Sequence, residues 1–242
     1  MRRSKKIILV LISFIVFVLF SLVYYVSEGS PIERYKFKKE VDSYIQEKFS
    51  QNIVTENIKY SFKNDLYWIL AHPENNKELS FEISQSWNDR GLWDDFLTAS
   101  WRFEVNQELE SFVKSVYAQK GTASINLGKT ISVVDKYSTI PYGEVPSYQD
   151  IKQELKDSII YIHIDRAFKK ESIEDEYDKV YKVIQFIKAK GYKFEQISFS
   201  YKGEQKDSPG KTFEFNSLDK VNSQDDIVKF ELLSRENSSD LE

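Results

Sequence analysis

The sequence predicts an α+β protein, with an N-terminal transmembrane helix and an ectodomain of two helix-and-antiparallel-sheet units. The first 26 residues join a basic segment to a long apolar run that carries no charge. Downstream, apolar residues recur at spacings of three and four, which is typical of amphipathic helices. Short alternating segments bounded by turn residues separate these helices and indicate antiparallel strands.

The apolar run at residues 7–26 is long enough to cross a bilayer. About 20 apolar residues that rise ~1.5 Å each span a hydrocarbon core of ~30 Å. The basic flank at residues 1–6 carries Arg2, Arg3, Lys5 and Lys6. Because positive charge stays on the cytoplasmic side, we expect a single-pass protein of the cell membrane with a cytoplasmic N-terminus and an extracellular C-terminus. The lipid bilayer is then the partner of residues 7–26.

A cleaved secretory signal is the alternative interpretation of this segment. A signal peptide has a shorter apolar region and small residues before the cleavage site. Here the run ends in Tyr24, Tyr25 and Val26, which are bulky. The sequence therefore favours an uncleaved signal anchor, with the two tyrosines at the outer membrane–water interface.

The part of the chain after Val26 is acidic and lacks cysteine. Of the 34 basic residues, four precede Glu28, whereas all 38 acidic residues follow Val26; the ectodomain thus carries 30 against 38, a net charge of −8. This balance argues against nucleic acid or anionic lipid as a partner, because such interfaces need a basic excess. The absence of cysteine excludes a disulfide framework.

The first unit is expected to occupy residues 27–136. Ser30 and Pro31 are typical of a helix start, and Asp94-Asp95 suit the start of a later helix. The predicted elements are a helix at 32–49, strands at 58–62 and 66–70 around a turn at 63–65, a turn at 72–77, a strand at 79–84, a helix from 96 to 117 closed by Lys120-Gly121, and a strand at 123–134.

A loop or linker is expected at 137–147, followed by a second unit at 148–242. Ser172 and Asp175 resemble a capping box, and Gly191 suits a helix end. The predicted elements are a short helix at 147–155, a strand at 158–165, a helix at 173–190, strands at 194–201 and 212–215, and a short helix or strand at 225–233.

Two segments carry a resemblance to a known family. Gly29-Ser-Pro-Ile-Glu-Arg-Tyr-Lys-Phe-Lys-Lys-Glu40 and Tyr181-Lys-Val-Ile-Gln-Phe-Ile-Lys-Ala-Lys-Gly-Tyr-Lys-Phe194 resemble the opening and closing blocks of YfjL-like proteins. These are small single-pass envelope proteins of Gram-positive bacteria. The resemblance implies a helical anchor and an α+β ectodomain outside the membrane, and it carries over no catalytic residue. The first unit is also similar in outline to PepSY and cystatin-like domains, a likeness of topology alone.

Few residues qualify as chemical candidates. His72 and His163 are the two histidines, and without cysteine they suggest no metal site; we expect no cofactor. Acidic pairs such as Asp94-Asp95 lie mostly at predicted helix starts, where carboxylates stay ionised. Asp165 is the catalytic candidate, because it closes an apolar strand.

The binding candidates are Trp87, Arg90 and Trp93, which surround a predicted polar turn. Such rings can stack on a glycan or a peptide, and the alternative is that they close the core of the first unit. Trp101 falls on the apolar face of the predicted helix and is expected in the core.

Two functions remain open. The first is a membrane-anchored, extracytoplasmic binding or regulatory module for an envelope protein, peptide or wall polymer. The second is an envelope hydrolase that cleaves cell-wall glycan through paired carboxylates. The sequence contains no enzyme signature, which favours the module. A pocket with two facing carboxyl groups, one of them desolvated, would favour the hydrolase.

Overall fold

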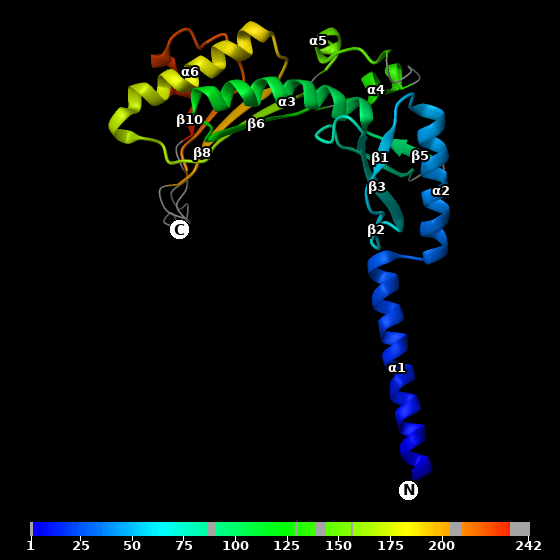
Figure 1. Ribbon diagram of the computed structural model, residues 1–242. Coiled ribbons are helices and arrows are strands. Elements are labelled where there is room, and N and C mark those ends of the chain that lie inside the picture. Colours follow the sequence, from blue (N-terminus) through cyan, green and yellow to red (C-terminus); the bar gives the residue numbers. More distant parts are fainter. Residues whose placement is uncertain are drawn as a thin grey trace, which may run out of the picture. The chain divides into compact units, whose positions relative to one another are not determined.

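The computed structural model describes residues 2–86, 91–128, 130–138, 144–155, 157–203 and 210–232. The protein is α+β and begins with a long apolar helix, α1 (Arg2–Glu28), shown in dark blue in Figure 1. Side chains along α1 from Leu11 to Val26 are exposed. By length and composition, this helix can cross a membrane.

The chain divides into two compact units, the first reaching to Ala99 and the second beginning at Ser100. The boundary between the units therefore lies inside helix α3 (Phe96–Val116), not at the expected 137–147 loop. The first turn of α3 contributes Phe96 to the first core, where its ring lies 5.2 Å from that of Phe81. The remainder of α3 belongs to the second unit.

The second helix begins where the sequence predicts. α2 (Pro31–Lys48) has Ser30 as its N-cap, with Pro31 in the first turn and the Ser30 side chain accepting a hydrogen bond from the Glu33 amide at 3.5 Å. Phe37 and Val41 are its buried residues. The Phe37 ring stacks on Tyr67 at 5.9 Å, so this face of α2 covers the first sheet.

Five antiparallel strands form the first sheet: β1 (Ile53–Thr55), β2 (Lys59–Ser61), β3 (Leu66–Pro73), β4 (Phe81–Gln85) and β5 (Leu92–Asp94). The order is β1-β3-β4-β5, and β2 pairs with the other half of β3. The turn expected at 72–77 starts later, because β1 pairs with β3 up to Pro73. His72 accordingly lies buried in a strand. Asp94 ends strand β5, and its carboxylate accepts a hydrogen bond from the Phe96 amide at the start of α3, as expected of a helix-start acid.

Helix α3 ends at Val116, one residue before the predicted end at 117, but Gly121 is not its cap. Directly after α3, Ala118 (φ 49°) and Gln119 (φ 68°) have a left-handed backbone. Gly121 already begins strand β6 (Gly121–Asn126). The strand expected at 123–134 stops at Asn126, since the paired strand β7 begins opposite it at Ile159. Residues beyond Asn126 have no strand to pair with, and they lead into helix α4 (Ile131–Tyr137).

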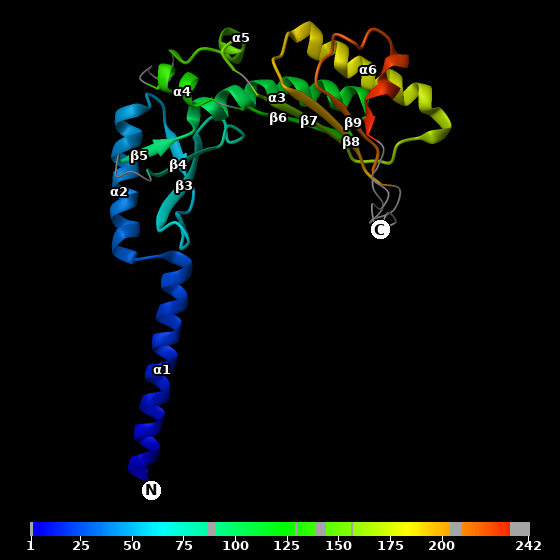
Figure 2. The same ribbon diagram turned by 180° about the vertical axis from the view of Figure 1, so that it is seen from behind.

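The second sheet has the order β10-β9-β8-β7-β6, and it is mixed rather than antiparallel. Its other strands are β7 (Ile159–Ile164), β8 (Gln196–Tyr201), β9 (Thr212–Phe215) and β10 (Glu231–Leu232). β7 and β8 run parallel because helix α6 (Ile173–Lys190) returns the chain to the starting end of the sheet. α3 and α6 cover one face, as Figure 1 and Figure 2 show from opposite sides.

The smaller elements complete the second unit. They are the short helix α5 (Tyr148–Ile151), the 3-10 helix η2 (Lys170–Ser172) and the 3-10 helix η3 (Gln224–Phe230). The expected 225–233 segment is thus both helical and extended. Gly191 has φ 62° and caps α6 as predicted, whereas the Ser172 side chain makes no capping hydrogen bond. The capping boxes lie instead at Ser147 with Asp150 and at Ser223 with Asp226.

A buried ion pair lies beside the last residues of β7 and β8. The Arg166 guanidinium donates to both oxygens of Glu176 at 2.8 and 2.7 Å, and Glu176 is fully buried. The same guanidinium lies 5.6 Å from the Tyr117 ring and 5.7 Å from the Tyr201 ring. The two hydroxyl oxygens are 2.8 Å apart, and burial raises the pKa of both tyrosines. The core of the second unit therefore contains a compensated charge.

Candidate functional site

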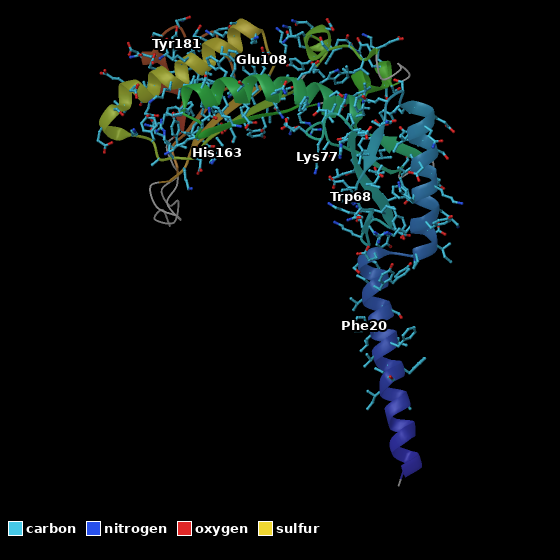
Figure 3. The ribbon with its side chains drawn as sticks, in the orientation of Figure 1. Phe20, Trp68, Lys77, Glu108, His163 and Tyr181 are labelled. Carbon is cyan, nitrogen blue, oxygen red and sulfur yellow. The ribbon has the colours of Figure 1, made fainter. Side chains whose placement is uncertain are left out.

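The face of the first sheet opposite α2 carries a row of side chains that are aligned across four strands. β-pairing places Lys59 opposite Trp68, Trp68 opposite Ser84, and Ser84 opposite Trp93. We call these four residues the aromatic row. Alternate residues Tyr67 and Ile69 of β3 are buried on the α2 side, so Trp68 points to the opposite side, as Figure 3 shows.

The aromatic row presents two indoles separated by a small side chain. Neighbouring strands lie ~4.8 Å apart, so the Trp68 and Trp93 backbones are ~10 Å apart with Ser84 between them. The Trp93 side chain is 50% exposed, and Trp68 is half-buried. The Lys59 ammonium lies 4.5 Å from the Trp68 ring centroid, a cation–π contact from the β2 side. The row thus combines flat apolar surface with a cation and a hydroxyl group.

Two carboxyl groups lie next to the row. Glu82 on β4 is paired opposite Leu70, and Asp95 follows β5. One Asp95 carboxylate oxygen accepts a hydrogen bond from the Glu82 amide at 2.6 Å. Burial, supported by the Asp95 charge, raises the pKa of Glu82 above its ordinary value, although a hydrogen bond with Ser84 and the Lys59 charge oppose the shift. Glu82 therefore holds its proton to a higher pH than an exposed glutamate.

Of the three predicted binding residues, Trp93 lies in this row. Trp87 and Arg90 lie outside the described residues, so the predicted cluster around the polar turn stays a prediction. Trp101 is buried in the second unit, as expected, and its indole N–H donates to the Pro146 carbonyl at 2.8 Å. The local sequence pattern did not single out Trp68 and Glu82 as site residues. Alternation within residues 66–70 and 79–84 could have placed them on one face, but only the strand register puts them beside Trp93.

The catalytic candidate Asp165 is a surface residue directly after β7. It forms an ion pair with Lys202 at 2.9 Å, and this hydrogen bond lowers the pKa of Asp165. The carboxylate is therefore ionised at neutral pH, which suits a surface ion pair better than a proton donor. Asp94 instead is buried, and its carboxylate accepts hydrogen bonds from Lys48 at 2.6 Å and from the Phe96 amide at 3.0 Å.

The two histidines have different surroundings. His72 is buried, and its Nδ1 lies 2.9 Å from the Pro73 carbonyl oxygen. His163 lies on the exposed face of the second sheet, where its Nδ1 is 3.1 Å from the Ser200 hydroxyl (Figure 3). Within the ranges that the structure describes, no three metal-binding side chains gather at one place.

The second unit contains a concave surface. It has a volume of about 740 Å³ and is lined by α3, α5, α6 and Tyr192. Phe112 and Phe186 stack face to face in it, with centroids 4.1 Å apart. Partial burial favours the protonated form of Glu108, but hydrogen bonds from Lys190 and Tyr192 outweigh it, so the pKa of Glu108 is lowered. Glu104 accepts a hydrogen bond from the Tyr148 amide at 2.5 Å. The Glu104 and Glu108 carboxylates thus connect α3 to α5, to the end of α6 and to Tyr192.

Comparison with known proteins gives one family match. Residues 4–95 match the model of the YfjL-like N-terminal domain. No curated protein and no solved structure matches the chain. The match contains α1 from Ser4 onward, α2 and the whole first sheet, and it ends at Asp95, immediately before α3. The part of the chain that carries the aromatic row is therefore similar to the YfjL-like N-terminal domain.

Proposed function

We propose that this protein is a membrane-anchored, extracytoplasmic binding or regulatory module, and that its ligand contacts the aromatic row. The ligand class is an envelope protein, a peptide or a wall polymer. The aromatic row is the observation that carries the proposal, because indoles on an uncovered sheet face provide stacking surface for a sugar ring or a peptide side chain.

The location is inferred from the N-terminal segment. The uncharged run of α1 suits a signal anchor, and the basic residues before it favour a cytoplasmic N-terminus. The family match over residues 4–95 supports the resemblance to YfjL-like proteins, from which we infer a Gram-positive envelope protein. The outline similarity to PepSY and cystatin-like domains agrees with a binding role and is part of the proposal.

Site-specific photo-crosslinking of the full chain in intact cells tests the binding function. A photoreactive amino acid at Ser84 lies between the two indoles, and the same amino acid at Ser124 is the matched control on the exposed face of the second sheet. We expect a crosslinked product of higher mass from position 84 and none from position 124. Trp68→Ala combined with Trp93→Ala should abolish the product.

Equal crosslinking from both positions would contradict the proposal, as would a product that survives loss of both indoles. Circular dichroism of the double variant, purified in detergent, checks that the first unit remains folded. This control is needed because Trp68 is half-buried.

One observation favours a second function, hydrolysis of cell-wall glycan. Glu82 has a raised pKa and lies beside Asp95, and a pair of carboxyl groups with different pKa values can supply a general acid and a base or nucleophile. If the protein is a hydrolase, Glu82→Gln should abolish release of soluble wall fragments, whereas Asp165→Asn should leave it unchanged. Fragment release by Glu82→Gln at the wild-type rate excludes this role for Glu82.

A further inference from the structure

The end of the first unit that adjoins α1 exposes large apolar side chains. Among the described residues of this unit beyond α1, the exposed large hydrophobic residues are Ile32, Tyr35, Val54, Phe62 and Trp93. Ile32, Tyr35 and Phe62 belong to the two segments next to the end of α1. They are 68%, 62% and 57% exposed. We call these three residues the apolar collar.

Several contacts hold the collar close to α1. Only Gly29 and Ser30 separate α1 from α2, so Ile32 and Tyr35 lie in the first two turns after the junction. Arg34 pairs with Glu28 and donates to the Ile58 carbonyl at 3.1 Å. Arg34 therefore ties α1, α2 and the segment before β2 together.

Two tyrosine side chains connect the β2–β3 hairpin to the junction between α1 and α2. The Tyr67 hydroxyl donates to the Ser30 carbonyl at 3.1 Å, and the Tyr60 and Tyr67 rings pack 4.9 Å apart beside Gly29. Phe62 is in the turn of this hairpin, which Figure 1 and Figure 2 both show beside the end of α1. The apolar collar thus lies on segments that are hydrogen-bonded to the junction between α1 and α2.

Bilayer dimensions place the collar in the headgroup layer. If hydrocarbon surrounds residues 7–26, the polar layer extends a further ~5–7 Å on each side. Glu28 lies two residues beyond Val26, or ~3 Å along the helix axis. The start of α2 and the tip of the hairpin therefore lie at the depth where aromatic and aliphatic side chains gain most from the interface.

We infer that Ile32, Tyr35 and Phe62 insert into the lipid headgroup layer of the membrane that α1 crosses. The occupant of this surface is the bilayer itself, because the collar is continuous with the membrane-spanning helix. Lys36 pairs with Glu33 at 2.8 Å, and Lys39 lies 4.8 Å from the Tyr35 ring centroid. Acidic and basic residues are mixed here, so the attraction is mainly apolar burial and needs no anionic lipid.

This inference rests on the proposed membrane anchor, and one experiment separates the two. The chain has no cysteine, so single cysteines can carry an environment-sensitive fluorophore in the full-length protein, reconstituted in phosphatidylcholine vesicles. Phe20→Cys reports the span, Lys63→Cys reports the collar, and Lys77→Cys is the matched control. Lys63 and Lys77 are both exposed, in turns at opposite ends of β3. Figure 3 labels Phe20 and Lys77.

Spin-labelled lipids provide the readout. We expect acyl-chain quenchers to quench the label at position 20 and headgroup quenchers to quench the label at position 63 but not at 77. Replacing Ile32, Tyr35 and Phe62 together with serine should remove most of the quenching at position 63. Circular dichroism of this variant tests whether the fold is retained.

Each outcome decides one claim. If position 20 is quenched while positions 63 and 77 behave alike, the collar does not enter the headgroups, and the anchor stands. If position 20 is not quenched, α1 does not span the bilayer, and both proposals fall. Quenching at position 63 that persists in the folded serine variant shows that the apolar side chains do not cause the contact.

Discussion

Gly29 allows the tight junction between α1 and α2. Its φ is +73°, and a Cβ atom there would overlap the Tyr67 hydroxyl. Gly91 has a similar φ of +84°, and no atom of the residues that the structure describes lies within 4 Å of the position a Cβ atom would take there. The two glycines therefore share the backbone requirement and differ in the space around them.

We expect Gly29→Ala to destabilise the first unit more than Gly91→Ala does. The left-handed backbone costs an alanine about 1–2 kcal/mol at either position, and only Gly29→Ala adds overlap with Tyr67. Urea unfolding in detergent, followed by circular dichroism, measures the difference. Equal losses of stability would show that Tyr67 moves aside without cost.

Glu82 should make stability depend on pH in the acid range. Its pKa is raised in the folded state, so the folded protein binds this proton more tightly than the unfolded chain does. The resulting stabilisation is present below the ordinary value of 4.5 and is lost as the pH rises through the folded pKa. As the pH increases from 4 to 7, we expect the melting temperature of Glu82→Gln to rise relative to that of the wild type, because the variant has no carboxyl group that loses its proton. A constant difference between the two proteins would contradict the shift.

The chemical character of the site residues could be predicted from the sequence. Which of these residues lie side by side could not. The core position of Trp101 follows from the local pattern, whereas the local pattern left open whether Trp93 is exposed or closes the core. The pairing of Trp68 with Trp93 depends on β4 lying between β3 and β5 in a particular register. Register is set by packing against α2, which no local pattern contains.

At the scale of elements, the buried Arg166–Glu176 pair joins the loop after β7 to the first turn of α6. We expect Arg166→Met to cost up to about 3–5 kcal/mol, because the fully buried Glu176 carboxylate loses its closest ion-pair partner and keeps the more distant Lys179, at 3.3 Å. The double variant Arg166→Met with Glu176→Leu should recover most of that loss. Hydrogen exchange of β7 and α6 peptides measures both effects.

A matched surface pair provides the control for this cycle. Lys182 and Asp178 form an ion pair on the same helix at 2.6 Å, with the lysine side chain well exposed. Lys182→Met should change exchange little, since exposed pairs contribute about 0–1 kcal/mol. A loss in Lys182→Met equal to that in Arg166→Met would refute the special role of burial.

Helices were predicted better than strand ends. α2 and α6 follow from apolar periodicity with Ser30 at one start and Gly191 at one end. The strand expected at 123–134 was wrong beyond Asn126, and β1 was missed. Both depend on a partner distant in sequence, β7 in one case and the end of β3 in the other.

For the whole molecule, the membrane orientation is the prediction with the widest consequences. Because the chain lacks cysteine, Ser4→Cys and Lys77→Cys mark the two sides of α1. We expect a membrane-impermeant maleimide to label intact cells at position 77 only, and to label both positions after permeabilisation. The four basic residues before the apolar run are the physical reason.

The opposite pattern, with position 4 labelled in intact cells, would reverse the orientation. Labelling of both positions in intact cells would exclude a cytoplasmic N-terminus. Immunoblotting for chain length in the same samples distinguishes an uncleaved anchor from a processed signal peptide.

Composition and periodicity by themselves determined the apolar helix, the acidic cysteine-free remainder, the α+β class and most helices, because these properties depend on residues near one another in the chain. Tertiary structure alone decided the division inside α3, the parallel pairing of β7 with β8, the Arg166–Glu176 pair and the aromatic row. The β7–β8 pairing and the aromatic row join segments far apart in sequence, whose apolar patterns are compatible with several pairings until the layers pack. The Arg166–Glu176 pair and the division inside α3 depend on which residues each core buries. The side of a strand that stays uncovered is settled by where the helices lie.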